Sequence, residues 1–501
     1  MGRVYIYIRV YVVSAAILLT ISITGCSSAG SYVTSTPNPL VAAYNIPVPS
    51  GAQTWVEFGP DTNYGRQTSP LTAAPGSTMV QILVAGMLPS TPYHMRAHIQ
   101  YADGTTSVDR DWIFATGVVP ASLKPPSMTV SQPNSNLSPA PGVELLSTIG
   151  TNGLQGIVTD LKGNIIWYCP GAALPLKPLP NGHFIFNRTT SLQELDLACN
   201  TIRAVSVAQV NQSLQANGYD FTIPPNLGLT GGSPFSHDVL VLPNGHWIVI
   251  CQIEKSFSDL SGYPGTTNVV GDAVVDTDVN GNVAWAWSAF DHLDVNRHPF
   301  GLPDWTHSNA LAYTPDGNLL LSMRDQSWVL KLDYANGKGS GNIIWKLGNE
   351  GDFTLLGEDS SQWFYGQHYP NLLGTSGSQM ILAIYDDGDL RPDSDGVACT
   401  TSCYSRATIF QIDESTSLAN LLWAYSPGFY SFWGGSIGIL SSGDVEFDSS
   451  QPFPSNPNVS QIIEVTHTDS PQIVWEMTVS GADVYRGYRI PSLYPGVTWT
   501  Q

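Results

Sequence analysis

"VTDLKGNIIWY" (residues 158–168) and "VDTDVNGNVAWAW" (275–287) share one pattern: an aspartate, a glycine-containing turn, an apolar run and a tryptophan. Turns followed by short apolar runs are typical of paired β-strands. The pattern recurs in "LDYANGKGSGNIIWKLG" (332–348), "IDESTSLANLLWAYS" (412–426) and "EVTHTDSPQIVWEM" (464–477), with a weaker copy, "ELDLACNTIRAV", at 194–205. The chain therefore contains six copies of one unit.

A second half-motif, a turn followed by an apolar strand, accompanies the first. It occurs as "LPNGHFIF" (179–186), "LPNGHWIVI" (242–250), "TPDGNLLLS" (314–322) and a degraded "LSSGDVEF" (440–447). Six copies between residues 143 and 501 give a spacing of about 60 residues, enough for several short strands each. Radial repetition of small sheets protects their edges. We therefore predict an all-β fold with a six-bladed β-propeller over 143–501, although five or seven blades would also fit.

Two further features complete this propeller. The C-terminal stretch "VYRGYRIPSLYP" (484–495) would supply the strand that closes the ring. The tryptophans that end the repeats are expected to pack between the sheets rather than to stack on a ligand. They lie at positions 167, 287, 345, 423 and 475.

The region before the propeller carries a different β pattern. Residues 43–117 resemble a small fibronectin type III or immunoglobulin-like β-sandwich, with Tyr93 in the place of a tyrosine corner. The Pro/Ser-rich stretch 118–142 is predicted to be a linker that lies over the propeller. The sandwich contains no catalytic candidate, so we expect a spacer or a module for homodimerisation.

The N-terminus reads as an export signal. Arg3 and Arg9 precede an uncharged apolar run that is short for a membrane span, and "ITGC" ends at Cys26. This layout resembles a bacterial lipoprotein signal over 1–25, with Cys26 lipidated and 26–42 as a tether. An ordinary cleaved signal and a transmembrane anchor are the alternatives. We expect an extracytoplasmic protein, periplasmic or at the cell surface, attached to the membrane by its lipid.

The chain is strongly acidic. Its formal net charge is −20, and removal of residues 1–25 leaves 18 basic and 40 acidic residues, a net charge of 18 − 40 = −22. Nucleic-acid binding needs basic surfaces and is therefore excluded. The overall field also repels anionic substrates, so an anion would have to be held by a few local cations.

Five cysteines follow Cys26, and an oxidising compartment would allow some of them to pair. Cys399 and Cys403 are spaced to close a small loop, and Cys169 with Cys199 is a second candidate pair. The odd count leaves at least one free thiol. The sequence has no C-x-x-C pair, which argues against a zinc ribbon or a thioredoxin-type site.

Three repeats begin with a histidine 8 to 10 residues before the glycine of the following turn. They are His237 in "FSHDVLVLPNG", His307 in "DWTHSNALAYTPDG" and His368 in "GQHYPNLLGTSG". A lone histidine on a strand is usually a structural, hydrogen-bonded residue. Matching positions in successive blades, however, are related by rotation about the central axis. The equivalence therefore predicts a histidine cluster at one mouth of the channel.

Two polar residues are expected at the same mouth. Side chains alternate between the faces of a strand, so Asn309 should point with His307 while Ser308 points away. Arg324, in "LLLSMRDQSWVLKL", ends the next strand of the repeat and would bring a permanent planar cation.

The nearby acids are given structural roles. Asp238 and Asp304 are predicted to be hydrogen-bonding residues at turns or strand ends rather than catalytic acids. "YDDGDLRPDSDG" (385–396) is acidic, but its spacing misses that of an EF-type calcium loop, so we interpret it as a solvated loop.

These residue types fit two kinds of site. Three histidines with an open position suit catalytic zinc or copper, but an adjacent arginine would repel the metal and no carboxylate is obviously placed to help. Alternatively, a neutral imidazole attacks an electrophile while cations and amides hold oxygens whose charge grows in the transition state. The second arrangement suits sulfuryl or phosphoryl transfer.

Here the sequence resembles a known family. "SHDVLVLPNG", "DWTHSNALAY", "LLSMRDQSWVLKLD", "GNIIWKLG", "GQHYPN" and "IYDDG" occur in the order and setting found in bacterial arylsulfotransferases, over residues 143–495. The resemblance implies a six-bladed propeller with its active site at the central channel. It also implies ping-pong transfer of a sulfuryl group from a phenolic sulfate to a phenol acceptor, without a nucleotide donor, a cofactor or a metal.

The resemblance also assigns roles by motif. His368 would be the nucleophile that becomes sulfohistidine, and Arg324 would clamp the sulfuryl oxygens. Asn309, His307 and His237 would bind those oxygens or move the phenol proton. A base for that proton should titrate near neutrality, as histidine does, and the choice between His237 and His307 stays open.

Several positions depart from the family pattern and bear on substrate fit. Asp325 stands within the family's "RHQ", Asp387 replaces the asparagine of its "DNG", and Tyr369 follows the nucleophile. Two other functions remain as alternatives: a metal-dependent lyase or hydrolase that uses the histidines, and a non-catalytic propeller that binds partners at a surface.

Overall fold

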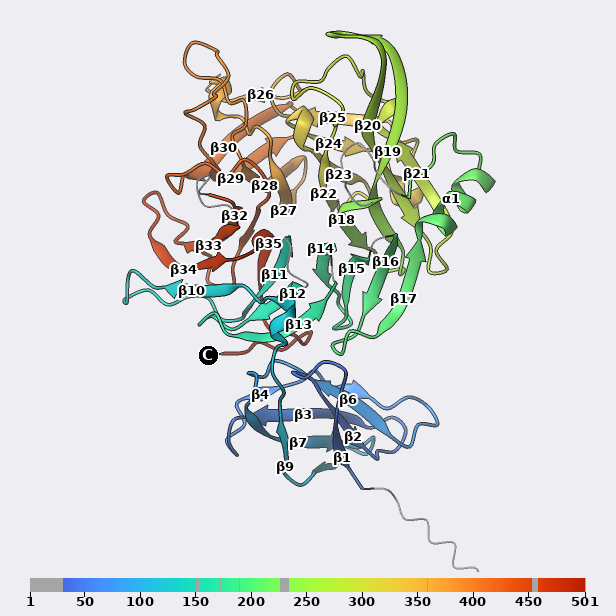
Figure 1. Ribbon diagram of the computed structural model, residues 1–501, viewed down its shortest axis with the longest axis vertical. Helices are drawn as coiled ribbons and strands as arrows, with labels where there is room; N and C mark the ends of the chain where they lie inside the picture. Colours follow the sequence, from blue (N-terminus) through green and yellow to red (C-terminus); the bar gives the residue numbers. More distant parts are fainter. Residues whose placement is uncertain are drawn as a thin grey trace, which may run out of the picture.

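The protein is described here by a computed structural model that covers residues 30–149, 154–171, 173–188, 190–225, 234–357, 359–452 and 458–500. Almost all regular structure within these ranges is β-strand, arranged as a small N-terminal sandwich below a ring of six sheets (Figure 1). The predicted fold class is therefore confirmed. The expected signal peptide and Cys26 lie outside the described residues, within which no helix is both long and apolar enough to cross a membrane.

The N-terminal domain is built from two sheets. Alternating burial along its longest strand, Pro92–Gln100, shows why these residues pair: every second side chain enters the core. The Tyr93 hydroxyl accepts a hydrogen bond from the Leu88 backbone N–H at 3.0 Å, as expected of a tyrosine corner. One sheet holds β1 (Tyr32–Ser35), β2 (Ala42–Ile46) and β6 (Val80–Val84), and the other holds β3 (Gln53–Gly59), β4 (Arg66–Gln67), β5 (Leu71–Thr72), β7 (Pro92–Gln100), β8 (Thr106–Val108) and β9 (Trp112–Ala115).

Two segments expected to be irregular contain strands. β1 lies within the expected tether 26–42, where its Tyr-Val-Thr-Ser sequence pairs with β2 as an edge strand. The linker 118–142 forms a short 3-10 helix, Ala121–Leu123, and then β10 (Ser127–Ser131), which pairs with the outer strand of the last propeller sheet. The linker thus lies against the propeller and extends one of its blades.

The six propeller sheets follow one another in sequence. Each consists mainly of antiparallel strands that are consecutive in the chain. The first three hold β11 (Val143–Ile149), β12 (Leu154–Thr159) and β13 (Ile165–Pro170); β14 (Ala173–Pro178), β15 (Phe184–Arg188), β16 (Ser191–Leu195) and β17 (Thr201–Ser206); and β18 (Phe235–Val241), β19 (Trp247–Leu260), β20 (Tyr263–Thr277) and β21 (Val283–Ser288). The single described α-helix, α1 (Val207–Ala216), joins the second and third sheets, with Ser206 as its N-cap.

The last three sheets repeat this arrangement. They hold β22 (Ser308–Tyr313), β23 (Leu319–Met323), β24 (Trp328–Leu332) and β25 (Ile343–Leu347); β27 (His368–Ser376), β28 (Gln379–Asp386), β29 (Arg406–Asp413) and β30 (Leu418–Tyr425), with the short β26 (Thr354–Leu355) parallel to β30; and β31 (Ser436–Ile439), β32 (Val445–Ser450), β33 (Val459–Val465) and β34 (Ile473–Ser480). Short 3-10 helices at 289–291, 324–326, 335–337 and 360–362 shape the connections.

The ring closes through the C-terminus. β35 (Asp483–Ile490) pairs antiparallel with β11, so the last strand of the chain is the innermost strand of the first sheet. This confirms the closing role predicted for "VYRGYRIPSLYP". The strands β14, β18, β22, β27 and β35 face the centre of the ring (Figure 1).

The repeated tryptophans lie on the outer strands of the blades, where they fill the space between neighbouring sheets. Trp167, Trp287, Trp345 and Trp475 are all at most 6% exposed. Trp423 is half-buried and stacks on Tyr425. The prediction that these tryptophans are packing residues is confirmed.

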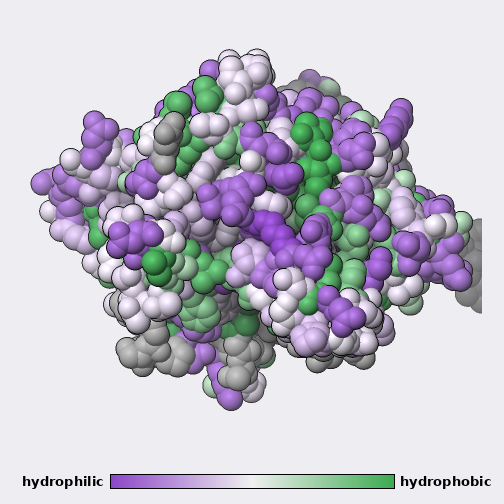
Figure 2. All heavy atoms as spheres, turned by 90° about the horizontal axis from the view of Figure 1, so that it is seen from above, coloured by the Kyte–Doolittle hydropathy of each residue, from purple (hydrophilic) through white to green (hydrophobic). Residues whose placement is uncertain are grey.

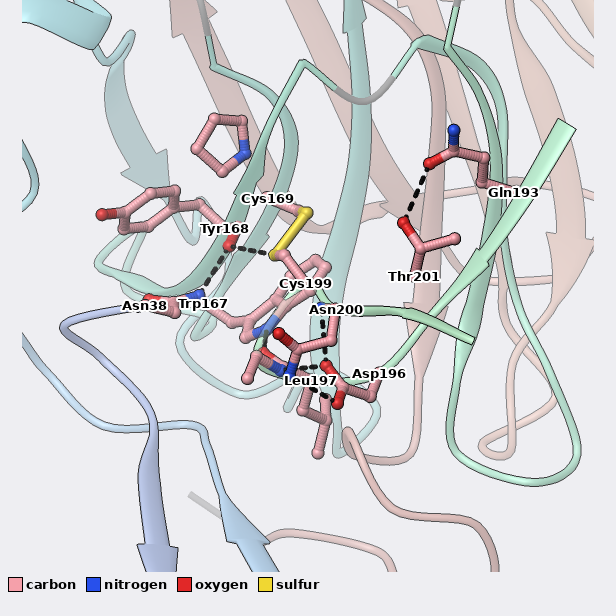
Figure 3. Close-up of a disulfide and its surroundings, with 12 residues drawn as sticks. Asn38, Trp167, Tyr168, Cys169, Gln193, Asp196, Leu197, Cys199, Asn200 and Thr201 are labelled. Carbon is pink, nitrogen blue, oxygen red and sulfur yellow. Dashed lines mark hydrogen bonds between the residues drawn. A yellow bond between two sulfur atoms is a disulfide. The ribbon is translucent and has the colours of Figure 1, made fainter. Parts of the chain in front are cut away.

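One disulfide joins two blades. Cys169 on β13 is bonded to Cys199 in the turn before β17 (Figure 3). Beside it, the Trp167 indole N–H donates a hydrogen bond to the Leu197 carbonyl at 2.7 Å. The Asn38 side chain, from the segment that precedes β2, lies beside this disulfide and donates a hydrogen bond to the Tyr168 carbonyl at 2.8 Å. The sandwich is therefore tied to the propeller at this blade junction.

A second disulfide, Cys399–Cys403, closes a short loop, and Cys251 is a buried free thiol. Both candidate pairs from the sequence are thus formed, with one cysteine left over as the odd count required. On the side of the molecule seen in Figure 2, from above the view of Figure 1, hydrophilic side chains are spread widely with smaller hydrophobic patches between them.

Candidate functional site

The three predicted histidines sit where the innermost strands of three consecutive blades begin. His237 and His307 have φ angles of 38° and 44°, and Tyr369, directly after His368, has a φ of 49°. Each strand also has an irregular register at this point. Left-handed conformations and β-bulges at non-glycine residues re-aim side chains and cluster at functional sites.

This backbone conformation changes the expected relation between His307 and Asn309, which strand alternation had placed on one face. β22 begins at Ser308, so His307 precedes the strand, and the register shifts again between Ser308 and Ala310. Simple alternation therefore does not relate His307 to Asn309. Asn309 is fully buried, and its amide donates to the carbonyl of Gln367, the residue before His368, at 2.7 Å.

The histidine rings converge at one end of the channel. The ring centroids of His237 and His307 lie 4.7 Å apart. Tyr485, on the closing strand β35, contacts both His237 and His368, with centroid distances of 5.6 and 5.7 Å. The predicted cluster therefore exists, and a tyrosine that the sequence argument did not single out lies between two of its members.

His368 is the most enclosed of the three, at 1% exposure. Its Nδ1 lies 2.5 Å from Oδ2 of Asp387, and the Gly434 backbone N–H donates to its Nε2 at 3.3 Å. An Nε2 that accepts a hydrogen bond carries no proton. Burial, followed by the charges of Arg324 and His307, lowers the pKa of His368 well below its usual value. The ring is therefore neutral, with its proton on Nδ1.

The stretch "YDDGDLR" is not solvated, contrary to our interpretation of 385–396. Asp386 and Asp387 are fully buried, and Asp389 is 6% exposed. Asp386 accepts hydrogen bonds from Arg391 at 2.5 Å and from Arg406 at 2.8 Å. Only from residue 393 onwards is the loop mainly exposed. The spacing of these acids differs from that of an EF-type loop, but it does not reveal that the carboxylates have cationic and imidazole partners.

Arg324 follows β23 and reaches the same region. Its guanidinium donates to Asp325 at 2.5 Å, to Asp389 at 2.7 Å and to the Phe432 carbonyl at 2.9 Å. Burial lowers the pKa of Arg324, but Asp325, Asp389 and Asp387 together raise it above its usual value. The cation is present as predicted, but two carboxylates compensate its charge. Its Nε has no hydrogen-bond partner among the described residues.

The pKa of His307 shifts in the opposite direction from that of His368, although each ring has its Nδ1 beside a carboxyl group. The Nδ1 of His307 lies 2.6 Å from Oδ2 of Asp304. Burial disfavours the charged form, but the carboxylates of Asp304 and Asp325 raise the pKa of His307 to about 9. His307 is therefore an imidazolium at neutral pH. Asp304 is the hydrogen-bonding residue predicted, although its partner is a site histidine.

His237 is neutral. Burial lowers the pKa of His237 well below its usual value, and the charges of His307 and Arg486 add to this effect. Arg486 lies on β35 and is itself held by Asp238, 3.2 Å away, which also pairs with Lys177 at 2.5 Å. Asp238 thus has the structural role predicted, in a buried ion cluster next to the histidines.

One group of side chains has metal-ligand character. Atoms of Asp304, His307 and Asp325 lie within 4.8 Å of one another. The expectation that no carboxylate is close to the histidines is wrong. Asp304 is already hydrogen-bonded to His307, however, and Asp325 to the Arg324 guanidinium, so both acids have partners of their own. The donor set is that of two ion pairs rather than of a site prepared for a cation.

Four residues of the site were not singled out as such from the sequence. Asp387 and Asp389 were assigned to a solvated loop, and Tyr485 and Arg486 were noted only within the closing strand. The one available signal was that Asp387 stands where the resemblance led us to expect the asparagine of a "DNG" motif. The contacts of the other three depend on which blades become neighbours, which the order of motifs alone does not specify.

Comparisons with known proteins bear on the whole propeller. No curated protein sequence matches the chain. Among solved structures, a streptogramin B lyase is similar over 72% of this chain and 99% of its own, at 10% identity and a TM-score of 0.28. A DUF4221 protein from Bacteroides vulgatus covers 72% and 97%, at 7% identity and a TM-score of 0.31. Scores this low carry no argument about function.

The comparison with family models identifies one family over most of the chain. The model described as "Arylsulfotransferase (ASST)" matches residues 143–489, which span every blade and contain the three histidines, Asn309 and Arg324. This match covers well over half of the chain and agrees with the resemblance carried by the motifs. The chain belongs to the arylsulfotransferase family.

Proposed function

We propose that this arylsulfotransferase moves a sulfuryl group from a phenolic sulfate ester to a phenol acceptor in two steps, through a sulfohistidine at His368. The observation that carries the proposal is a buried, neutral imidazole with an unprotonated Nε2, placed beside a permanent cation, Arg324, and a protonated histidine, His307. A neutral imidazole is the nucleophilic form of the side chain.

In the first half-reaction, the Nε2 lone pair forms a bond to sulfur as the bond between sulfur and the aryl oxygen breaks. The sulfuryl oxygens gain hydrogen-bond acceptor strength as the leaving oxygen departs, so fixed donors stabilise this state more than the ground state. Arg324 and the imidazolium of His307 supply these charges, and buried Asn309 supports the segment before the nucleophile. The leaving phenolate takes a proton from His307.

In the second half-reaction, the oxygen of the acceptor phenol attacks sulfur and the electron pair of the nitrogen–sulfur bond returns to Nε2. The acceptor's proton passes to His237, which is neutral at the start. Its centroid lies 4.7 Å from that of His307, and the higher pKa of His307 makes the onward transfer favourable. That transfer restores the resting enzyme.

The reaction as proposed needs no nucleotide, cofactor or metal, because the donor ester carries the activated group and the protein supplies the charges. With the N-terminal signal and Cys26 expected from the sequence, we place the enzyme outside the cytoplasm on a lipid anchor. Donor and acceptor would then be small phenolic compounds of that compartment.

The test uses purified protein in chelator, 4-nitrophenyl sulfate as donor and phenol as acceptor. We expect phenol-dependent release of nitrophenolate, a covalent mass increase on the peptide that contains His368 when acceptor is omitted, and loss of both in His368→Ala. The matched control is His246→Ala, since His246 also pairs with a buried aspartate but lies in the turn between β18 and β19, away from the strand starts that carry the three site histidines. Acceptor-independent release would indicate hydrolysis, and activity that appears only on metal addition would favour a metal-dependent enzyme.

A further inference from the structure

Asp387 has an unusual environment for a carboxylate. It is fully buried, and its Oδ2 lies 2.5 Å from Nδ1 of His368. Its Oδ1 has no hydrogen-bond partner among the described residues. Burial, followed by the charge of Asp389, raises the pKa of Asp387 well above its usual value, so an isolated carboxylate here would be costly. The Nδ1–H of His368 is the one side-chain donor to this carboxyl group among the described residues, so the geometry ties the ionised form of Asp387 to His368.

The backbone around Asp387 holds the carboxylate in place. The Ser405 hydroxyl donates to the Asp387 carbonyl at 2.9 Å, and the next residue, Gly388, donates its N–H to the Tyr365 carbonyl at 2.9 Å. A side chain added at Gly388 would meet the Tyr404 carbonyl oxygen at 2.1 Å, so the chain is tightly enclosed there. A carboxylate on so constrained a turn can fix the orientation of the ring that it contacts.

Building on the proposed sulfohistidine mechanism, we propose that Asp387 is a positioning residue that keeps the proton of His368 on Nδ1 and so presents Nε2 to sulfur. When Nε2 bonds to the sulfuryl group, the ring becomes positively charged because Nδ1 keeps its proton. The Asp387 carboxylate faces that charge directly. When the acceptor attacks, the electron pair returns to Nε2 and Nδ1 is still protonated, so the residue acts in both half-reactions without transferring a proton.

This role depends on a carboxylate and not only on its shape. An asparagine at position 387 would accept a hydrogen bond from the Nδ1–H through its amide oxygen and hold the ring, but it carries no charge to face the sulfurylated imidazole. The substitution Asp387→Asn therefore tests what this chain gains from its acid. Asp387→Ala removes both orientation and charge.

Two readouts test the proposal. The first is the rate of the nitrophenolate burst from 4-nitrophenyl sulfate without acceptor, which reports sulfohistidine formation alone. We expect a loss of about 100-fold or more in Asp387→Ala, which removes the group that fixes the tautomer of a catalytic histidine. We expect a smaller loss, about 10-fold, in Asp387→Asn, because the Gly434 N–H still holds Nε2 unprotonated and the amide oxygen accepts from Nδ1–H. The second is the imidazole ¹⁵N spectrum, in which the His368 proton should move from Nδ1 towards Nε2 only in Asp387→Ala.

The matched controls are Asp276→Ala and Asp276→Asn. Asp276 is also buried and accepts a hydrogen bond from a histidine, His246, at 2.9 Å, but outside the channel. These variants should retain the wild-type burst rate. Thermal unfolding of every variant identifies any that fail to fold. If Asp387→Ala does not fold, the imidazole ¹⁵N spectrum and the burst rate of the isosteric Asp387→Asn test the proposal instead.

The outcomes separate this inference from the proposed function. If Asp387→Ala keeps the wild-type burst rate and tautomer while His368→Ala is inactive, Asp387 has no positioning role and the sulfohistidine mechanism stands. Equal losses in Asp387→Ala and Asp387→Asn with an unchanged tautomer would also overturn the inference. If His368→Ala itself retains the burst, the proposed function fails.

Discussion

The ring centroids of His237 and His307 lie 4.7 Å apart, yet His237 is neutral and His307 is protonated at neutral pH. The difference has a local cause. His307 has the carboxylates of Asp304 and Asp325 beside it, whereas His237 is buried near His307 and Arg486, which are both cationic. Pairs of titratable groups whose environments separate their pKa values are a sign of acid and base roles.

The first prediction concerns pH. Since Asp304 and Asp325 raise the pKa of His307 to about 9, His307 stays protonated at pH 7 and loses its proton as the pH rises through 9. If the imidazolium is needed, kcat/KM for 4-nitrophenyl sulfate is constant around neutrality and falls above pH 9. Asp304→Asn lowers the pKa of His307, so the descending limb should move by about one pH unit or more towards neutrality.

The control for this shift is Asp111→Asn. Asp111 pairs with His94 at 2.7 Å in the N-terminal sandwich, so it resembles the Asp304–His307 pair but lies in the other domain. The pH dependence of kcat/KM in Asp111→Asn should match that of the wild type. An Asp304→Asn enzyme with an unshifted limb would mean that His307 does not carry the proton that limits the reaction.

The repeats predicted the fold because they report local rules. Each turn and tryptophan can be interpreted within one blade, and six such units leave few ways to protect their edges. The histidines were found for the same reason, since equivalent positions in a repeat become neighbours at the axis. The carboxylates could not be found this way. Asp387 and Asp389 follow β28, and their partners His368 and Arg324 come from β27 and from the preceding blade.

The ionisation states were also beyond the sequence. Three histidines at matching positions look equivalent in the repeat pattern, but burial and different neighbours make one cationic and two neutral. Arg324 is a similar case. It lies near His368 as expected, but it forms ion pairs with Asp325 and Asp389, so the net field of the site cannot be deduced from its residue types.

The second prediction tests Arg324. Its planar guanidinium bonds simultaneously to Asp325, Asp389 and the Phe432 carbonyl. A lysine keeps the charge but cannot make this fork, so Arg324→Lys should lower kcat by about 100-fold with a smaller change in KM. Arg203→Lys is the control, because Arg203 lies over Trp247 on an outer strand and bonds to backbone carbonyls. A rise in KM alone would show that Arg324 binds the donor without stabilising the transition state.

The third prediction compares the two disulfides. Cys169–Cys199 spans 30 residues and links two blades, whereas Cys399–Cys403 spans 4. Closing the longer loop restricts the unfolded chain more, by about 4 against about 2 kcal/mol in the loop-entropy estimate. Denaturant unfolding of the two Cys→Ser double variants should therefore show the larger loss for Cys169 and Cys199. The reverse order would indicate that contacts of the short loop outweigh loop entropy.

The fourth prediction links stability to pH through Asp448. Burial raises the pKa of Asp448 to about 7, although Ser436, the Gly487 N–H and Arg486 act in the opposite direction. A carboxyl with a raised folded pKa takes up a proton on folding, so it destabilises the protein as the pH rises from about 4 to 7. The substitution Asp448→Asn would keep a side-chain oxygen for the Ser436 hydroxyl and the Gly487 N–H without the charge.

The free energy of unfolding of Asp448→Asn relative to wild type should therefore increase by about 2 kcal/mol between pH 5 and pH 8, as measured by denaturant unfolding. The control is Asp413→Asn, at an exposed turn, which should show no such trend. A difference between Asp448→Asn and wild type that does not depend on pH would mean that Asp448 is already ionised in the folded protein at pH 5, so that burial does not raise its pKa.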